Sequence, residues 1–298
     1  MWVCSNDATH QFPERTEDGF CPHCSFRGTL IPEAIDKLDD QPQGTVPKGE
    51  QGEQRDVGLC ILLMDASGSM SEKPFSNAES TKAELIARSA ARGIFDLESM
   101  TMTQNAYLCI IMFDANVKQI AFDTVSNLLR KHHRDPIRFE QFLLSKLKEM
   151  GGMTDLNKAL LAAEALANKF LNKSIPSFQD YTVMKHRIMK KDAKTISVPN
   201  VRVLLYTDGH HNATGEVVVN PFQGQSPDLL MGAYFGAASD KGNQQLTAIL
   251  SECPVHEGVL QHFLFDDPTN VGSLRHLFRM ASNTSGFCPK CMNISASV

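Results

Sequence analysis

The sequence lacks an apolar run long enough to cross a membrane, because its longest apolar stretches are only as long as strands. It also lacks an excess of positive charge: the formal net charge is −5 and the pI about 6.1. Composition therefore gives no reason to expect nucleic acid or an anionic membrane as the main partner. The first residues, MWVCSNDATHQF, contain neither the basic nor the apolar stretch of a signal peptide. We expect a cytoplasmic protein that does not bind membranes.

Aliphatic side chains are scarce in residues 1–30, which hold three cysteines. Too few apolar residues are present there to form a core, so a small zinc ribbon or knuckle is predicted. Residues 31–56 are predicted to be a linker, since 39–56 are rich in Pro, Gly, Gln and charge. The main domain is predicted over 57–285, followed by a tail, 286–298, that contains CPKC.

Strand and helix patterns alternate through the main domain. Continuous apolar runs at 58–64, 106–114, 201–209, 229–236 and 262–267 are typical of strands buried on both faces. The run 117–122 follows a short turn and is expected to pair antiparallel with its predecessor. Amphipathic helical patterns separate most of these strands, and Thr81 and Glu84 are spaced as a capping box at the start of one of them. The polar, basic stretch 172–198 is expected to be a surface insertion. The fold class is therefore α/β, with a doubly wound, mostly parallel, Rossmann-like sheet.

Oxygen-bearing side chains gather where these strands end. Asp65 and Asp208 follow apolar strands, and Thr154 stands in a loop just before a helix. All three should lie at one edge of the sheet, at the carboxyl ends of its parallel strands, which we call the rim. Ser67 and Ser69 alternate with small residues after Asp65, so their side chains can face the same point. Carboxylate and hydroxyl oxygens suit Mg²⁺ or Mn²⁺.

Three motifs in order resemble a von Willebrand factor A (VWA) domain. They are DASGS (65–69) after a buried strand, GGMTDL (151–156) before a helix, and YTDG (206–209) at the end of a later strand. The resemblance covers roughly residues 57–284. One such motif alone is a weak signal, but three at the right strand ends are a specific one.

The resemblance implies a metal-ion-dependent adhesion site (MIDAS). Ser67, Ser69 and Thr154 would bind the ion directly, while Asp65 and Asp208 would act mainly through water. A sixth position would stay open for an Asp or Glu of a partner protein. Neutral hydroxyls would leave the ion electrophilic, so that it still attracts an anionic ligand.

Other interpretations of DASGSM explain less of the sequence. An ordinary turn capped by Asp and Ser leaves the two later motifs as coincidence. A G-x-S-x-G nucleophile elbow would need Gly in place of Asp65, and a D-x-D phosphatase would need Asp in place of Ser67. The loop also lacks a G-x-x-x-x-G-K phosphate loop. A serine hydrolase using Ser67 with a rim histidine, His210 or His211, remains an alternative.

Six of the eight cysteines suit zinc, while Cys60 and Cys109 fall inside predicted strands and are expected in the core. A first zinc site is predicted from a C-x5-H-x10-C-x2-C spacing, in which Asp7 or His23 could replace the histidine. Its ligands would be Cys4, His10, Cys21 and Cys24.

A second zinc site is predicted at the edge opposite the rim, where two helices end. Its ligands would be Cys253, His256, Cys288 and Cys291. A competing arrangement joins the two C-x2-C pairs, Cys21 and Cys24 with Cys288 and Cys291, in one site that clasps the chain ends. A third possibility leaves the C-terminal pair without metal. The chain would thus carry one or two Zn²⁺ ions.

The leading functional hypothesis is a non-enzymatic protein-interaction module that binds a partner's acidic residue through Mg²⁺. The zinc knuckles and the expected cytoplasmic location resemble intracellular prokaryotic VWA proteins, of the tellurite-resistance-associated or AAA+-associated type. That resemblance implies a role in a bacterial multi-protein stress or defence system. The alternative from another class is a nucleic-acid-binding adaptor that uses the zinc ribbon and the basic run 185–194.

Overall fold

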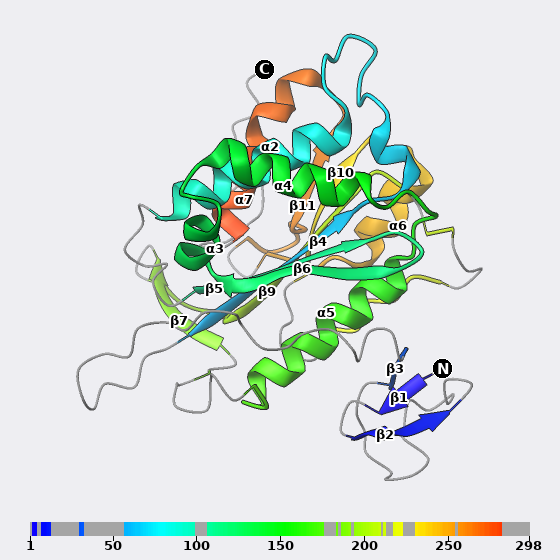
Figure 1. The fold of residues 1–298 in the computed structure, drawn as a ribbon. Coiled ribbons are helices and arrows are strands. Elements are labelled where there is room, and N and C mark those ends of the chain that lie inside the picture. Colours follow the sequence, from blue (N-terminus) through cyan, green and yellow to red (C-terminus); the bar gives the residue numbers. More distant parts are fainter. Residues whose placement is uncertain are drawn as a thin grey trace.

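A six-stranded sheet forms the centre of the protein in the computed structural model (Figure 1). The structure describes residues 2–4, 7–12, 30–32, 57–98, 106–175, 183, 186–191, 194–209, 211–212, 217–222, 230–253 and 256–281. The strand order is β11-β10-β9-β4-β5-β6. The strands are β4 (Gly58–Asp65), β5 (Ala106–Phe113), β6 (Val117–Thr124), β9 (Val201–Thr207), β10 (Leu230–Phe235) and β11 (His262–Phe265).

Only β6 runs against the others. It pairs antiparallel with β5, whereas every other neighbouring pair in this sheet is parallel. The predicted mostly parallel α/β sheet is therefore confirmed, including the antiparallel pairing of 117–122. Because the long crossovers reverse direction beside β4, the carboxyl ends of β4 and β9 face a common edge, the predicted place for a ligand.

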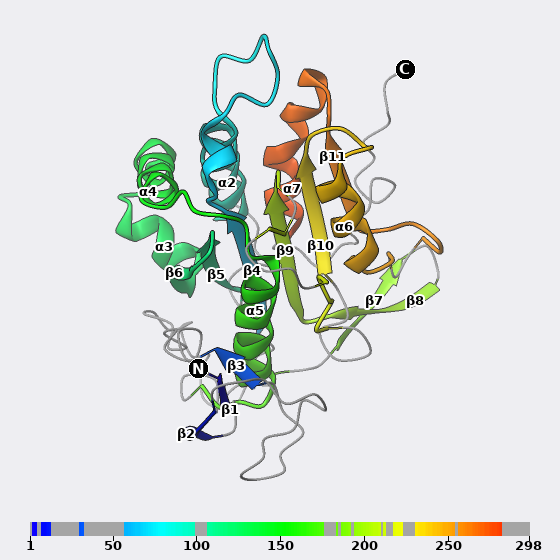
Figure 2. The same cartoon turned by 90° about the vertical axis from the view of Figure 1, so that its right-hand side faces the viewer.

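Helices cover both faces of the sheet (Figure 2). On β4, Leu59, Ile61 and Leu63 pack in one hydrophobic cluster with α5 (Leu156–Leu171) and α6 (Lys241–Ile249). The alternate residues of β4 face a second cluster, which includes α2, α3, α4 and α7. Their bounds are α2 (Lys82–Glu98), α3 (Val125–Lys131), α4 (Pro136–Lys148) and α7 (Ser273–Ala281). Burial on both faces explains the uninterrupted apolar runs of the strands.

Side-chain caps fix where the helices begin. Before α2, the Glu84 amide donates to Thr81 Oγ1 at 3.2 Å and the Thr81 amide donates to Glu84 Oε2 at 2.9 Å, so the capping box expected from the sequence is present. Asp155 caps α5 by accepting a hydrogen bond from the Lys158 amide at 3.0 Å. These caps matter for the site because α2 and α5 both start at the rim.

Three features extend what the sequence indicated. Residues 172–198, expected as a surface insertion, include an antiparallel hairpin of β7 (His186–Lys191) and β8 (Lys194–Pro199). The short helix α3 was not predicted.

Near the N-terminus, β1 (Trp2–Cys4), β2 (Asp7–Phe12) and β3 (Leu30–Pro32) form a small antiparallel sheet in the order β2-β1-β3. Of the predicted linker 31–56, residues 31–32 belong to β3, and residues 33–56 lie outside the described residues.

Two 3-10 turns complete the described elements. One is η1 (Gly68–Ser71), directly after β4, and the other is η4 (Pro268–Gly272), before α7. Within the described part of the chain, no helix combines the length and apolar character needed to cross a membrane.

Candidate metal centre at the rim

Asp65 ends β4 and is completely buried. Its Oδ1 accepts a hydrogen bond from the Ser67 amide at 2.8 Å, and its Oδ2 accepts one from the Thr207 hydroxyl at 2.6 Å. Thr207 is the last residue of β9, the strand next to β4. The carboxylate is thus held between two neighbouring strand ends.

Burial and charge both act on the ionisation of Asp65. Removal from water, together with the nearby charge of Asp208, raises its pKa to about 6, although hydrogen bonds from Thr207 and Ser67 oppose the shift. Such a pKa shows that the surroundings do not fully compensate the carboxylate's charge. A divalent cation would supply that compensation.

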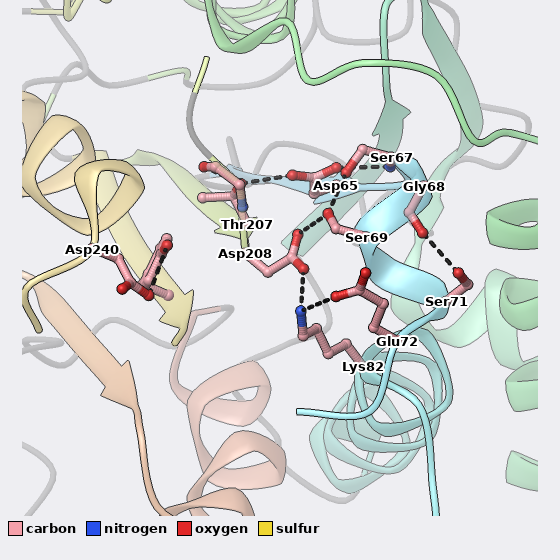
Figure 3. A network of polar contacts seen from close by, with 12 residues as sticks. Asp65, Ser67, Gly68, Ser69, Ser71, Glu72, Lys82, Thr207, Asp208 and Asp240 are labelled. Carbon is pink, nitrogen blue, oxygen red and sulfur yellow. Dashed lines mark hydrogen bonds and ion pairs between the residues drawn. The ribbon is translucent and has the colours of Figure 1, made fainter. Parts of the chain in front are cut away.

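A chain of hydrogen bonds links the two strand ends across the rim (Figure 3). The hydroxyls of Ser67 and Ser69 lie 3.1 Å apart, and Ser69 Oγ donates to Asp208 Oδ1 at 2.8 Å. Asp240, also labelled in Figure 3, stands apart and accepts a hydrogen bond from the Ala237 amide at 2.7 Å. Asp65, both serines and Asp208 therefore belong to one polar cluster.

Thr154 joins this cluster from the loop before α5, and it is 2% exposed. A Cβ placed on Gly209 would lie 2.9 Å from Thr154 Oγ1 and 3.9 Å from Asp65 Oδ2. Gly209 therefore lies against both side chains, and a Cβ there would displace the Thr154 hydroxyl. The structure brings all five residues predicted for the Mg²⁺ site to one rim.

The GGMTD loop is fixed by its neighbours. Asp114, directly after β5, accepts hydrogen bonds from the amides of Gly151 at 3.2 Å and Gly152 at 2.9 Å. Burial alone would raise the pKa of Asp114, but backbone amides, among them those of Asn116, Gly152 and Gly151, outweigh it and lower the pKa. On the other side, Thr154 receives support from Asn212, whose Oδ1 accepts from the Thr154 amide at 2.8 Å.

A lysine was missed by the sequence argument. Lys82, the first residue of α2, donates from Nζ to Asp208 Oδ2 at 2.6 Å. The same Nζ lies 3.7 Å from Glu72 Oε2. No motif marked Lys82, whereas Asp114 carried a signal that could have been used: an Asp directly after an apolar strand, as at Asp65.

The rim histidines have separate placements. His211 is buried, accepts a hydrogen bond from the Leu156 amide at 3.3 Å, and lies 3.8 Å from Asp155. It therefore helps to hold the start of α5. His210 lies outside the described residues.

The predicted zinc ligands are only partly described. Cys4 and Asp7 are register partners at the β1–β2 turn, and His10 lies on β2, whereas Cys21, His23 and Cys24 lie outside the described residues. Among the residues that are described, no group of three or more His, Cys, Asp or Glu could hold a metal ion. The first zinc site and the clasp arrangement thus stay predictions.

Half of the predicted second zinc site comes together. Cys253 Sγ lies 3.6 Å from His256 Nδ1. The segment sits at the edge opposite the rim, because the neighbouring Ser251 amide donates to the carbonyl of Leu230, the first residue of β10. Cys288 and Cys291 lie outside the described residues. Cys60 and Cys109 are buried in β4 and β5, which confirms their expected place in the core.

No family model matches the chain, and no curated protein does. Among solved structures it is similar to a von Willebrand factor type A protein from Catenulispora acidiphila, at 12% identity over 76% of this chain and 43% of that one, with a TM-score of 0.43. It is also similar to proximal thread matrix protein 1 from the mussel byssus with a zinc-occupied MIDAS motif, at 14% identity over 77% and 49%, with a TM-score of 0.42.

A third similar structure is the ArnB paralog VWA2 from Sulfolobus acidocaldarius, at 16% identity over 76% of this chain and 46% of that one, with a TM-score of 0.40. The matched region is less than half the length of each of these three structures. At these TM-scores the likenesses establish neither a family nor a function for this chain.

Proposed function

We propose that this chain is a non-enzymatic protein-interaction module of the VWA type. In this proposal, Mg²⁺ or Mn²⁺ at the rim takes an Asp or Glu side chain from a partner protein. The observation that carries the proposal is the convergence of two carboxylates and three hydroxyls at the rim, with the buried Asp65 left short of positive charge.

The donor set fits a hard divalent cation. Hydroxyl and carboxylate oxygens are the ligands that Mg²⁺ accepts, and this ion keeps several waters in protein sites. By the resemblance, Ser67, Ser69 and Thr154 would bind directly, and Asp65 and Asp208 through water. The ion would supply electrophilic attraction for a carboxylate, and the chain's own residues would set where that carboxylate docks.

In this proposal, hydrogen bonds around the rim hold the ligand residues in position. Thr207 and the Ser67 amide orient Asp65, while Asp114 fixes the loop that presents Thr154. Because these supports come from separate elements, the oxygens would be preorganised before an ion arrives. Preorganisation of this kind favours binding, since less conformational freedom is lost.

Zinc has a structural role in the proposal. One Zn²⁺ would be held by Cys4, His10, Cys21 and Cys24 and would stabilise the small N-terminal sheet. A second would use Cys253 and His256 with Cys288 and Cys291 at the opposite edge. A cytoplasmic location stays an expectation from the sequence, and a role in a bacterial stress or defence system is proposed from the sequence resemblance alone.

A peptide-display selection tests the function without knowledge of the partner. Immobilised full-length protein would be panned in Mg²⁺, and bound phage would be eluted with EDTA. We expect the eluted peptides to be enriched in Asp and Glu, and we expect the enrichment to vanish with the Thr154→Ala variant. Selected peptides that lack acidic residues, or that bind equally well in EDTA, would contradict the proposal.

A further inference from the structure

Lys82 reaches into the rim from the start of α2 (Figure 3). Its side chain is only 12% exposed, and its ammonium forms a close ion pair with Asp208, whose side chain is completely buried. On its other side the same ammonium lies 3.7 Å from Glu72 Oε2, in a side chain that is 70% exposed. One largely buried lysine side chain thus stands between an inner and an outer carboxylate.

The backbone fixes Lys82 in this position. Its amide donates to the Glu72 carbonyl at 2.9 Å, which closes the loop between η1 and α2. The Thr81–Glu84 capping box sets the helix start at the same point. A charge that is largely removed from water is costly unless it is paired, so the contact of Lys82 with Asp208 is a specific feature of the rim.

The Lys82 ammonium donates a hydrogen bond to Asp208, a residue that the proposed cation also needs. Asp208 Oδ1 accepts from Ser69 and its Oδ2 accepts from Lys82, so both oxygens are engaged. A divalent ion near Asp208 would also be repelled by the positive charge of Lys82. Lys82 and the cation therefore compete for the same carboxylate.

We propose that Lys82 is a built-in counter-cation of the rim, which pairs with Asp208 in the metal-free protein and weakens Mg²⁺ binding. Glu72 provides the second position for the ammonium when Asp208 turns toward the ion. This inference rests on the proposed metal site. Its consequence is that the bare site binds Mg²⁺ weakly, so a partner carboxylate adds a large part of the stability of the loaded state.

Titration calorimetry with Mg²⁺ alone tests the competition in full-length protein. We expect Lys82→Met to tighten Mg²⁺ binding about tenfold, because a repulsive charge and a competing donor are both removed. Lys82→Arg should bind like wild type. Lys73→Met is the matched control, since it removes the same charge from an exposed residue of the neighbouring loop, and it should change the affinity less than twofold.

Equal or weaker Mg²⁺ binding by Lys82→Met would overturn the role of Lys82 and leave the metal site standing. Lack of Mg²⁺ binding by both wild type and Lys82→Met would overturn the metal site, and with it the competition. Should Lys82→Met melt early by circular dichroism, Lys82→Gln provides the same loss of charge with a polar side chain.

The second position for the ammonium has its own test. Glu72→Gln removes the exposed carboxylate that would pair with the Lys82 ammonium after it leaves Asp208. The ion pair of Lys82 with Asp208 should then be harder to break, and Mg²⁺ affinity should fall about twofold. The same substitution should have no effect in the Lys82→Met background. Loss of affinity in both backgrounds would show that Glu72 acts on the ion directly and would overturn the exchange.

A double-mutant cycle in EDTA tests the ion pair between Lys82 and Asp208 in the metal-free protein. Lys82→Met, Asp208→Asn and the double variant would be unfolded with urea at pH 7. We expect the effects of the two single changes on the free energy of unfolding to be non-additive. The double variant should be more stable than the sum of the two single effects predicts. Additive effects would show that the ion pair contributes nothing to the metal-free rim and would overturn the inference.

Discussion

The two edges of the central sheet differ in how they assemble polar ligands. At the rim, oxygen donors come from three separate loops and are linked by hydrogen bonds to neighbouring strand ends. At the opposite edge, a thiol and an imidazole come from one short segment, Cys253 to His256. The rim is thus completed by the fold of the domain itself, whereas the opposite edge needs further ligands.

This difference follows from topology. Parallel strands place their carboxyl ends together, so residues distant in sequence meet wherever neighbouring crossovers diverge. A short C-x2-H segment brings only two ligands, whereas a structural zinc site needs four. The predictions below act on one edge at a time, from the largest expected effect to the smallest.

Asp65→Asn should separate metal binding from stability. We expect Mg²⁺ affinity to fall at least 100-fold, because one of the two carboxylates of the site is gone. In EDTA at pH 7 the same variant should be more stable than wild type by roughly 2–3 kcal/mol, since a buried carboxylate with a pKa near 6 resists ionisation. Urea unfolding in EDTA and calorimetry with Mg²⁺ measure the two effects, and a destabilised variant would contradict this account.

The pH should change how strongly Mg²⁺ stabilises the wild-type protein. The pKa of Asp65 is raised to about 6 in the fold, so the protonated form is favoured there and stability is lost as pH rises from about 4 through 6. Mg²⁺ should restore that loss only where Asp65 is ionised. The Mg²⁺-induced rise in Tm should therefore be several degrees larger at pH 7.5 than at pH 5, and equal rises at both would contradict the prediction.

Gly209→Ala should loosen the rim without removing any ligand. The new methyl would lie 2.9 Å from Thr154 Oγ1, so the hydroxyl must move, and Mg²⁺ affinity should fall about tenfold. Gly272→Ala is the control, because nothing lies within 4 Å of a Cβ there. Calorimetry that finds the same affinity for both variants would show that Thr154 is not a ligand.

Changes at the opposite edge should leave the rim intact. Cys253→Ser should reduce zinc from two ions per chain to one by elemental analysis, with Mg²⁺ affinity changed less than twofold. Cys109→Ser, which removes a buried thiol from β5, should leave the zinc content unchanged. Unchanged zinc in Cys253→Ser would favour the clasp of the two C-x2-C pairs or a chain end without metal.

The sequence predicted the parts of the structure that local patterns encode. Apolar runs located the six strands of the central sheet, and Thr81 with Glu84 located the start of α2. The three motifs placed Asp65, Thr154 and Asp208 at one edge, because strand direction alone determines which ends meet.

The remaining parts depend on contacts that no local pattern records. Lys82 begins an amphipathic helix and has the sequence context of an ordinary surface lysine, yet its ammonium reaches Asp208. Likewise Asn212 acts on the GGMTD loop from a separate element. Such residues become visible only after the chain has folded, since their partners are distant in sequence.

Anomalous diffraction from crystals soaked in Mn²⁺ tests the central claim most directly. The account predicts a single strong Mn²⁺ peak at the rim within bonding distance of the hydroxyls of Ser67, Ser69 and Thr154, and its loss in the Asp65→Asn variant. No peak at these three hydroxyls in the wild-type crystal, or a peak there that survives in Asp65→Asn, would contradict it.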